Sequence, residues 1–151
     1  MEHKSISRLL LSAGAVVAVA AALVALWILP DYVLHTEGAV FPKVVCLILD
    51  AACVFFAYSA LYRYALICTE IGKDKSFSRA NVTNMGKIAG SLFYCGACCL
   101  LMAVPLRFLS VFWPEAIVTA LACGGLGVIA YALSRLLDHA VSLQEENDLT
   151  V

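Results

Sequence analysis

The stretch VVCLILDAACVFFAYSALYRYALI, residues 44–67, decides the fold of this chain. Asp50 and Arg63 are its formally charged side chains, and nearly all of the others are apolar. An α-helix rises about 1.5 Å per residue, so a helix of this length spans the roughly 30 Å hydrocarbon layer of a bilayer. We therefore predict that residues 44–67 cross a membrane as an α-helix.

The composition of the whole chain points the same way. Of its 151 residues, 63% are hydrophobic and only 14% are charged, and the mean hydropathy is +0.92. Soluble domains carry about 25% charged residues, and a chain this poor in charge cannot cover itself with polar surface. The lipid bilayer is therefore the expected solvent for much of the exterior. A net charge of -1 offers no electrostatic grip on nucleic acid, so we expect no direct nucleic-acid binding.

Three further apolar stretches flank the first one, at about 9–29, 88–104 and 116–137. Residues 9–29 exceed the apolar core of about 7–15 residues found in secretory signal peptides, so we interpret them as a retained membrane anchor. The sequence thus predicts an all-α integral membrane protein. Its four transmembrane helices are expected to form a compact antiparallel bundle, as a single domain over residues 1–151.

Local signals refine the helix ends and the packing. Ser78 is a suitable N-cap residue, so the third helix is expected to begin before its apolar stretch, and Pro105 is expected to end it. Small residues that recur every four positions are expected to let helix backbones approach closely, and self-association into a homo-oligomer stays open. These runs are Gly14, Ala18 and Ala22; Gly86 and Gly90; and Ala116, Ala120 and Gly124.

The distribution of Lys and Arg predicts the orientation, because basic residues concentrate on the cytoplasmic side of membrane proteins. One side of the predicted spans holds Lys4, Arg8, Arg63, Lys73, Lys75, Arg79, Lys87 and Arg135, and the other side holds Lys43 and Arg107. We therefore expect both the N- and the C-terminus to be cytoplasmic.

Residues 138–151 are predicted to continue the last helix as a cytoplasmic tail. Apolar residues keep a helical spacing as far as Leu143, while the opposite face is polar and acidic. The apolar face has three possible positions. It can lie on the bilayer surface, pack against the polar start of the third helix, or receive another protein.

Asp50 is the strongest anomaly within a predicted span, because an ionisable side chain at the centre of a membrane costs at least about 2.5–3.5 kcal/mol. It lies about 12 Å into its helix, where water or an ion pair with Lys43 or Arg107 would satisfy its carboxylate in a purely structural role. The alternative is an ion, proton or ligand site that uses Asp50 and Arg107. That alternative describes a small transporter, channel or immunity-type protein.

The chain has seven cysteines, all inside or at the ends of apolar stretches, and we interpret them as reduced, buried packing residues. Cys95, Cys98 and Cys99 include a CxxC spacing that in other proteins marks a thiol-redox site. Apolar burial suppresses the reactive thiolate, so redox activity is the weaker alternative. His3, His35 and His139 lie outside the spans, which leaves a zinc site without support. No nucleophile, acid-base pair or phosphate-binding loop is recognisable, so we expect no enzyme, cofactor or metal.

Two motifs support a family resemblance. They are Ile71-Gly-Lys-Asp-Lys-Ser-Phe-Ser-Arg-Ala-Asn-Val82 before the third helix and Gln144-Glu-Glu-Asn-Asp-Leu-Thr-Val151 at the end of the chain. With the four-span layout, they make the chain resemble the domain-of-unknown-function 2975 family of bacterial membrane proteins. The resemblance implies a multi-pass protein of the bacterial plasma membrane. It carries no established activity, but its members resemble neighbours of small helix-turn-helix regulators in bacterial genomes.

This resemblance suggests a regulatory or sensor role for a non-enzymatic membrane protein. The loop before the third helix and the tail would hold or release a cytoplasmic helix-turn-helix regulator. Acidic tail residues would meet a basic DNA-reading helix, and leucines would supply apolar anchors. The candidate partner-binding residues are Phe77, Asn81, Leu143, Glu145, Glu146, Asp148 and Leu149. The alternative is that these segments are ordinary solvated ends.

Overall fold

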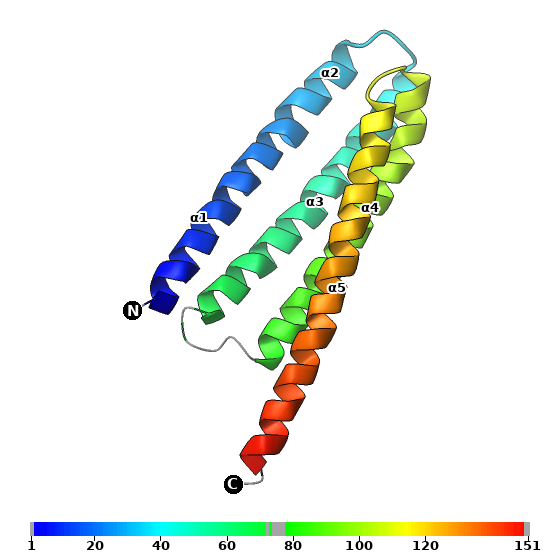
Figure 1. The fold of residues 1–151 in the computed structure, drawn as a ribbon. Coiled ribbons are helices and arrows are strands. Elements are labelled where there is room, and N and C mark those ends of the chain that lie inside the picture. Colours follow the sequence, from blue (N-terminus) through cyan, green and yellow to red (C-terminus); the bar gives the residue numbers. More distant parts are fainter. Residues whose placement is uncertain (1, 72, 74–77, 150–151) are drawn as a thin grey trace.

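The structure is a computed structural model that describes residues 2–71, 73 and 78–149. Side chains at positions 2–6, 18, 21, 22, 24, 25, 148 and 149 lie outside this description, although their backbone is included. Within these ranges the regular elements are all helical (Figure 1). The prediction of an all-α protein is therefore confirmed for the described part of the chain.

The first helical segment consists of three consecutive pieces. These are α1 (Glu2–Leu23), a π-helical turn η1 (Val24–Ile28) and α2 (Leu29–His35). The π-helical turn immediately precedes Pro30, which has no backbone N–H to continue the regular hydrogen-bond ladder. Gly38 then turns the chain at φ +145, a conformation that residues with a Cβ rarely adopt.

Three long helices follow: α3 (Val40–Ile71), α4 (Arg79–Phe108) and α5 (Trp113–Leu149). All three are long and apolar enough to cross a membrane. The described side chains of the first segment contribute only a shorter apolar stretch, Ser7–Val17. The protein is therefore a multi-pass membrane protein with three candidate spans. A fourth crossing and the orientation of the termini stay predictions.

The sequence predicted the start of α4 correctly but not its end. Ser78 caps the helix as expected: it has extended backbone geometry, and its hydroxyl accepts a hydrogen bond from the Asn81 N–H at 3.2 Å. The prediction that Pro105 ends the helix is wrong, because α4 continues to Phe108. A proline removes one backbone donor, but membrane helices tolerate it where neighbouring helices support the chain. Pro105 is itself buried against such neighbours.

A tight turn joins α4 to α5. The Val111 N–H donates to the Leu106 carbonyl at 3.0 Å, and the Ser110 N–H donates to the Arg107 carbonyl at 3.2 Å. These paired bonds form a Schellman motif, in which the residue after the helix adopts a left-handed conformation. Ser110 occupies this position with φ 58, where glycine is the usual residue.

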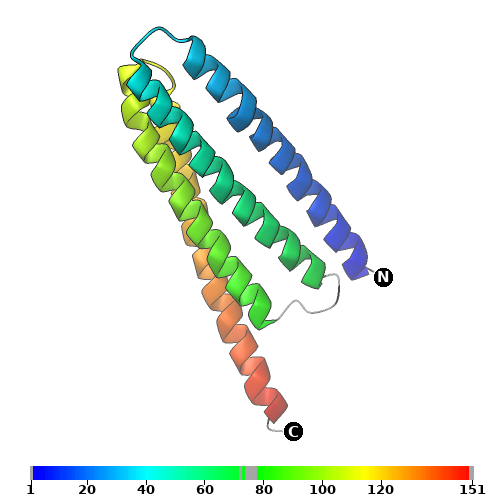
Figure 2. The same cartoon turned by 180° about the vertical axis from the view of Figure 1, so that it is seen from behind.

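The helices pack in chain order, with α4 between α3 and α5 (Figures 1 and 2). Over the described residues, α1 packs against α3 and makes no close approach to α4 or α5. The predicted compact four-helix bundle is therefore not confirmed, and the observed arrangement is more open on the side of α1. The N- and C-terminal ends lie at the same end of the molecule in both views.

Small residues permit close helix contacts at some of the predicted positions. A Cβ added to Gly14 would lie 2.6 Å from Tyr64 Cε1, so the tyrosine ring occupies the space that this glycine leaves. Gly90 and Gly124 have nothing within 4 Å of such a Cβ, so they do not serve as packing positions here. Among the described glycines, the closest approach to another helix's backbone is at Gly96, whose added Cβ would lie 3.1 Å from the Ala120 carbonyl oxygen.

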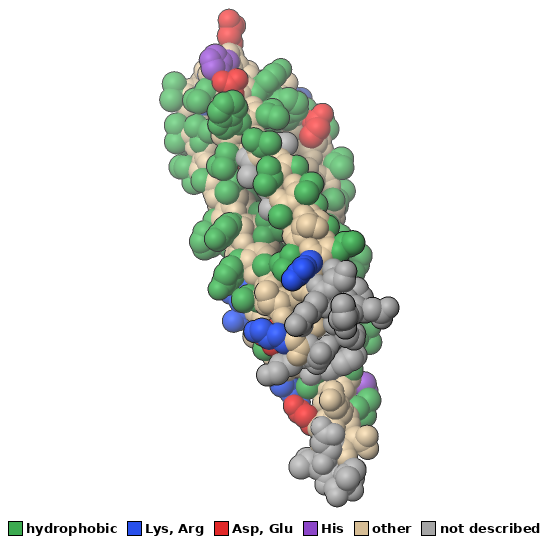
Figure 3. Space-filling model, turned by 90° about the vertical axis from the view of Figure 1, so that its left-hand side faces the viewer, with side chains coloured by type: hydrophobic (Ala, Val, Ile, Leu, Met, Phe, Trp, Pro, Cys, Tyr) green, Lys and Arg blue, Asp and Glu red, His purple; other side chains and the backbone are tan. Residues whose placement is uncertain are grey.

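The surface carries many exposed apolar side chains, as lipid contact requires. Figure 3 shows hydrophobic groups over most of the upper part of one face, while most visible Lys and Arg side chains lie in its lower half. Large residues such as Phe55, Tyr58, Leu121 and Val128 are more than half exposed. A water-soluble protein rarely exposes such extensive apolar surface.

Candidate functional site

Charged side chains join the start of α4 to the end of α5. Arg79 Nη2 and Nε donate to the two carboxylate oxygens of Glu145, at 2.6 and 3.1 Å. Its Nη1 donates to Asp138 Oδ1 at 2.6 Å. One guanidinium therefore binds two carboxylates that lie two turns apart on α5. The sequence motifs at residues 71–82 and 144–151 did not indicate this contact by themselves, because it joins residues 66 positions apart.

The residues of α5 that face α4 repeat at heptad spacing. Ser134 donates to the Val82 carbonyl at 3.0 Å, and Asp138 and Glu145 bind Arg79. Val141, which shares this face by its spacing, is only 4% exposed. Of the three possible positions for the tail, the structure thus places one face of α5 against the start of α4.

A second face of the same helix stays exposed. Leu136 and Leu143 are 67% and 53% exposed, and they lie seven positions apart on one side of α5. The 37 residues of α5 correspond to a length of about 55 Å, well beyond the roughly 30 Å of hydrocarbon. Figure 2 shows its end extending past the other helices. We call the exposed pair Leu136 and Leu143 the outer row of α5.

Electrostatics at this junction favour the charged forms of both partners, which lie beyond the apolar parts of their helices. The hydrogen bonds from Arg79 lower the pKa of the Glu145 carboxyl below its ordinary value. The same contacts raise the pKa of Arg79. The ion pair therefore persists at neutral pH, although its exposed position limits its energetic value.

The structure separates the predicted partner-binding residues into groups. Asn81 is only 1% exposed, so its side chain is not accessible in this structure, and its contact with a partner stays a prediction. Glu146 and Leu143 are exposed, and Glu145 is already paired with Arg79. Phe77 lies outside the described residues, and so do the side chains of Asp148 and Leu149.

Asp50 is buried at 6% exposure on the inner side of α3. The expected ion pairs with Lys43 and Arg107 do not form. Lys43 Nζ instead donates to the Leu34 carbonyl at 3.2 Å, and the Arg107 guanidinium lies 5.5 Å from the centre of the Trp113 ring. Each cation is therefore held at the helix ends, away from the carboxylate.

The family model described as Protein of unknown function (DUF2975) matches residues 34–151. The chain belongs to this family. The match contains both sequence motifs and all of α3, α4 and α5, which confirms the resemblance identified from those motifs. No curated protein and no solved structure matches the chain.

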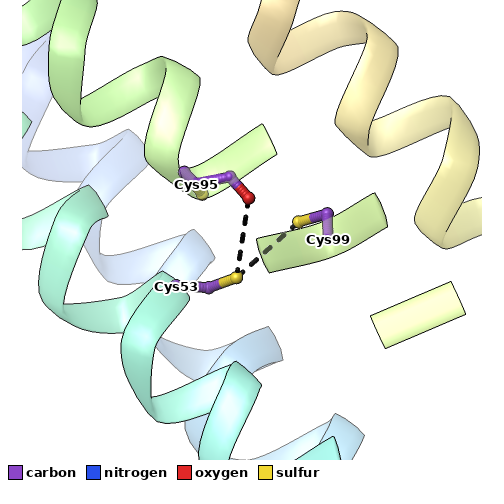
Figure 4. A group of neighbouring side chains, drawn as sticks. All are labelled: Cys53, Cys95 and Cys99. Atoms are coloured by element: carbon purple, nitrogen blue, oxygen red, sulfur yellow. Dashed lines mark hydrogen bonds between the residues drawn. The ribbon is translucent and has the colours of Figure 1, made fainter. Parts of the chain in front are cut away.

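This DUF2975 chain also contains a group of neighbouring thiols whose proximity was not predicted from the sequence. Cys95 and Cys99 lie one turn apart on α4, and Cys53 approaches them from α3 (Figure 4). The three Sγ atoms all lie within 4.8 Å of one another. The CxxC spacing drew attention to Cys95 and Cys98, but the helix contact selects Cys95 and Cys99, because residues four apart share a helix face.

Proposed function

We propose that this protein is a non-enzymatic membrane regulator that binds a small cytoplasmic helix-turn-helix regulator through the projecting end of α5. The single observation that carries the proposal is the division of this helix into two faces. One face is fixed against α4 by Arg79, and the outer row is exposed. A helix held rigid in this way presents apolar anchors without the entropic cost of ordering a free tail.

The proposed topology has four spans with both termini in the cytoplasm of a bacterial cell. The first helical segment runs alongside α3 in Figures 1 and 2, and both chain ends lie toward the same end of the molecule, which is consistent with an even number of crossings. The Lys and Arg count favours this end as the cytoplasmic one. The docking surface would then face the compartment that contains transcription regulators.

Charge supports the choice of partner. Glu146 is exposed on the projecting end, and Glu145 is held next to it by Arg79. A DNA-reading helix is basic because it must approach phosphates, so it is complementary to this acidic end. Binding the regulator here would cover the surface with which it contacts DNA. The membrane protein would thereby keep the regulator inactive until released.

Co-purification tests this proposal directly. The full chain and a neighbouring helix-turn-helix regulator are co-expressed, and the membrane fraction is solubilised in mild detergent before affinity capture. We expect the regulator to be recovered with the wild-type chain and with Gln144→Ala, an exposed control beside the outer row. Leu143→Glu and truncation after Leu137 should each lower recovery at least about tenfold, because a charge in an apolar anchor position costs several kcal/mol.

Equal recovery with the wild-type chain and the truncated chain would reject docking on α5. If recovery of the regulator falls equally with Gln144→Ala and Leu143→Glu, the outer row is not the docking surface. Protease accessibility of a tag at each terminus in sealed vesicles tests the topology separately. Protection of only one of the two tags would contradict the four-span arrangement.

Asp50 favours a second candidate function, a small transporter or channel. The Asp50 residue is only 6% exposed, and the ion pairs found among the described residues do not include it. An unpaired ionisable group within a span often marks an ion or proton pathway. On this reading Asp50→Asn abolishes ion flux into proteoliposomes while leaving membrane insertion unchanged. Flux that is absent with the wild-type chain, or equal with both chains, would remove this alternative.

A further inference from the structure

Three cysteine sulfurs converge at the contact between α3 and α4 (Figure 4). Cys53 Sγ lies 3.7 Å from Cys99 Sγ, and the Cys53 thiol donates to the Cys95 carbonyl oxygen at 3.8 Å. Cys53 and Cys99 are 9% and 6% exposed, and Cys95 packs against them. The thiols therefore form one shielded group with contributions from two helices.

The distances match what a three-sulfur metal site needs. A metal ion bound at about 2.3 Å by three sulfurs in a plane places those sulfurs about 4 Å apart. All three Sγ atoms already lie within 4.8 Å of one another. Small side-chain rotations would complete the site, with no movement of the helices. The site would join α3 to α4 through its ligands.

Packing alone does not account for this convergence. Cys68 shows what a packing cysteine looks like in the same protein: it is 1% exposed and belongs to no such group among the described residues. Filling space requires a small apolar side chain, which alanine also provides. Ligation, in contrast, requires several sulfur atoms close together, as these three are.

The ligand type selects the ion. Sulfur donors favour soft cations such as copper(I), whereas structural zinc sites usually have four ligands in a tetrahedron. Among the described His, Cys, Asp and Glu side chains, no fourth ligand joins the three cysteines within the same distance.

We propose that Cys53, Cys95 and Cys99 form an intramembrane copper(I) site. Two thiols each release a proton and bind as thiolates, while the third binds as a neutral sulfur donor. The complex then carries one net negative charge, two protons leave, and no electron is transferred. This site is independent of regulator docking on α5, so either proposal can fail without the other.

Copper(I) titration of the full-length protein in detergent micelles tests the site. Under ascorbate and without oxygen, the protein competes with a chromogenic copper(I) chelator, and zinc(II) is titrated in a parallel arm. We expect one copper(I) per chain and weaker retention of zinc(II). Cys53→Ser and Cys99→Ser should each lower copper(I) affinity about 100-fold or more, because each removes a ligand. Cys68→Ser is the matched control and should bind copper(I) as the wild type does.

X-ray absorption on the wild-type complex gives a result that needs no variant. The expected shell contains three sulfurs at about 2.3 Å. A shell of nitrogen and oxygen would overturn the proposal even if a variant failed to fold. Copper(I) binding that survives both ligand substitutions, or that Cys68→Ser removes equally, would also overturn it. Preference for zinc(II) over copper(I) would show that the ion has been misassigned and would reject the proposal as stated.

Discussion

Arg79 at the start of α4 holds Glu145 near the end of α5 through two hydrogen bonds to its carboxylate, at 2.6 and 3.1 Å. The geometry is the side-by-side pairing that a guanidinium and a carboxylate favour. Both residues belong to the motifs that identify the family, or lie directly beside them. The two motifs are therefore parts of one structural unit, in which the first fixes the position of the second.

Replacing Arg79 with alanine should loosen the projecting end of α5. The substitution leaves Asp138 and Glu145 without their shared cation and adds mutual repulsion between them. Hydrogen exchange of residues 138–147 should speed up several-fold, while exchange within the spans stays unchanged. Lys87→Ala is the control, because Lys87 is an exposed basic residue of the same helix. Unchanged exchange in Arg79→Ala would show that the ion pair does not order the tail.

The same contact predicts a pH dependence. The Glu145 pKa is lowered from an ordinary value of 4.5 by its hydrogen bonds from Arg79. A group whose pKa is lowered by folding contributes its full stability above the unfolded pKa and loses it as the pH falls through the folded pKa. Protease resistance of the tail should therefore stay constant from neutral pH down to about 4.5 and then decline. Glu145→Gln should remove this decline, and a decline that persists in the variant would assign it to another group.

Gly96→Ala should weaken the contact between α4 and α5. The new Cβ would lie 3.1 Å from the backbone oxygen of Ala120, which cannot move as a side chain can. We expect a loss of about 1–3 kcal/mol in unfolding free energy, measured in mixed micelles by denaturant titration. Gly90→Ala is the matched control, because it lies in the same helix with nothing within 4 Å. Gly90→Ala should not lose stability, because alanine is the better helix former. A similar loss in both variants would mean that the close approach at Gly96 is not its cause.

Ser110→Gly should stabilise the protein. Ser110 has φ 58 at the left-handed position of the turn between α4 and α5, where glycine avoids a steric cost of about 1 kcal/mol. A higher thermal unfolding midpoint in detergent, with unchanged helical content, would confirm this. Ser142→Gly, inside α5, should lower the midpoint instead. A lower midpoint for Ser110→Gly would indicate that the serine side chain makes a stabilising contact.

The interior of each long helix could be predicted from sequence, whereas the ends and the contacts between helices could not. Residues 44–67 lie within α3, and the cap at Ser78 followed from its residue type. The continuation through Pro105 did not follow, because a proline's effect on a helix depends on neighbours that support the backbone. The pairing of Asp50 with Lys43 or Arg107 failed for a similar reason: each cation instead contacts a residue of a neighbouring helix, Leu34 of α2 for Lys43 and Trp113 of α5 for Arg107.

Hydropathy alone determined that much of this chain lies in lipid as helices, because an apolar segment in a bilayer can satisfy its backbone polar groups only internally. That requirement is local, so it can be recognised from a run of consecutive apolar residues. The tertiary structure decided which distant side chains meet: Arg79 with Glu145, Tyr64 with Gly14, and Cys53 with Cys95 and Cys99. These contacts depend on how each helix is rotated and shifted against its neighbour. In a uniformly apolar segment, hydrophobicity does not distinguish one rotation from another, so small shape differences and a few polar groups select the arrangement.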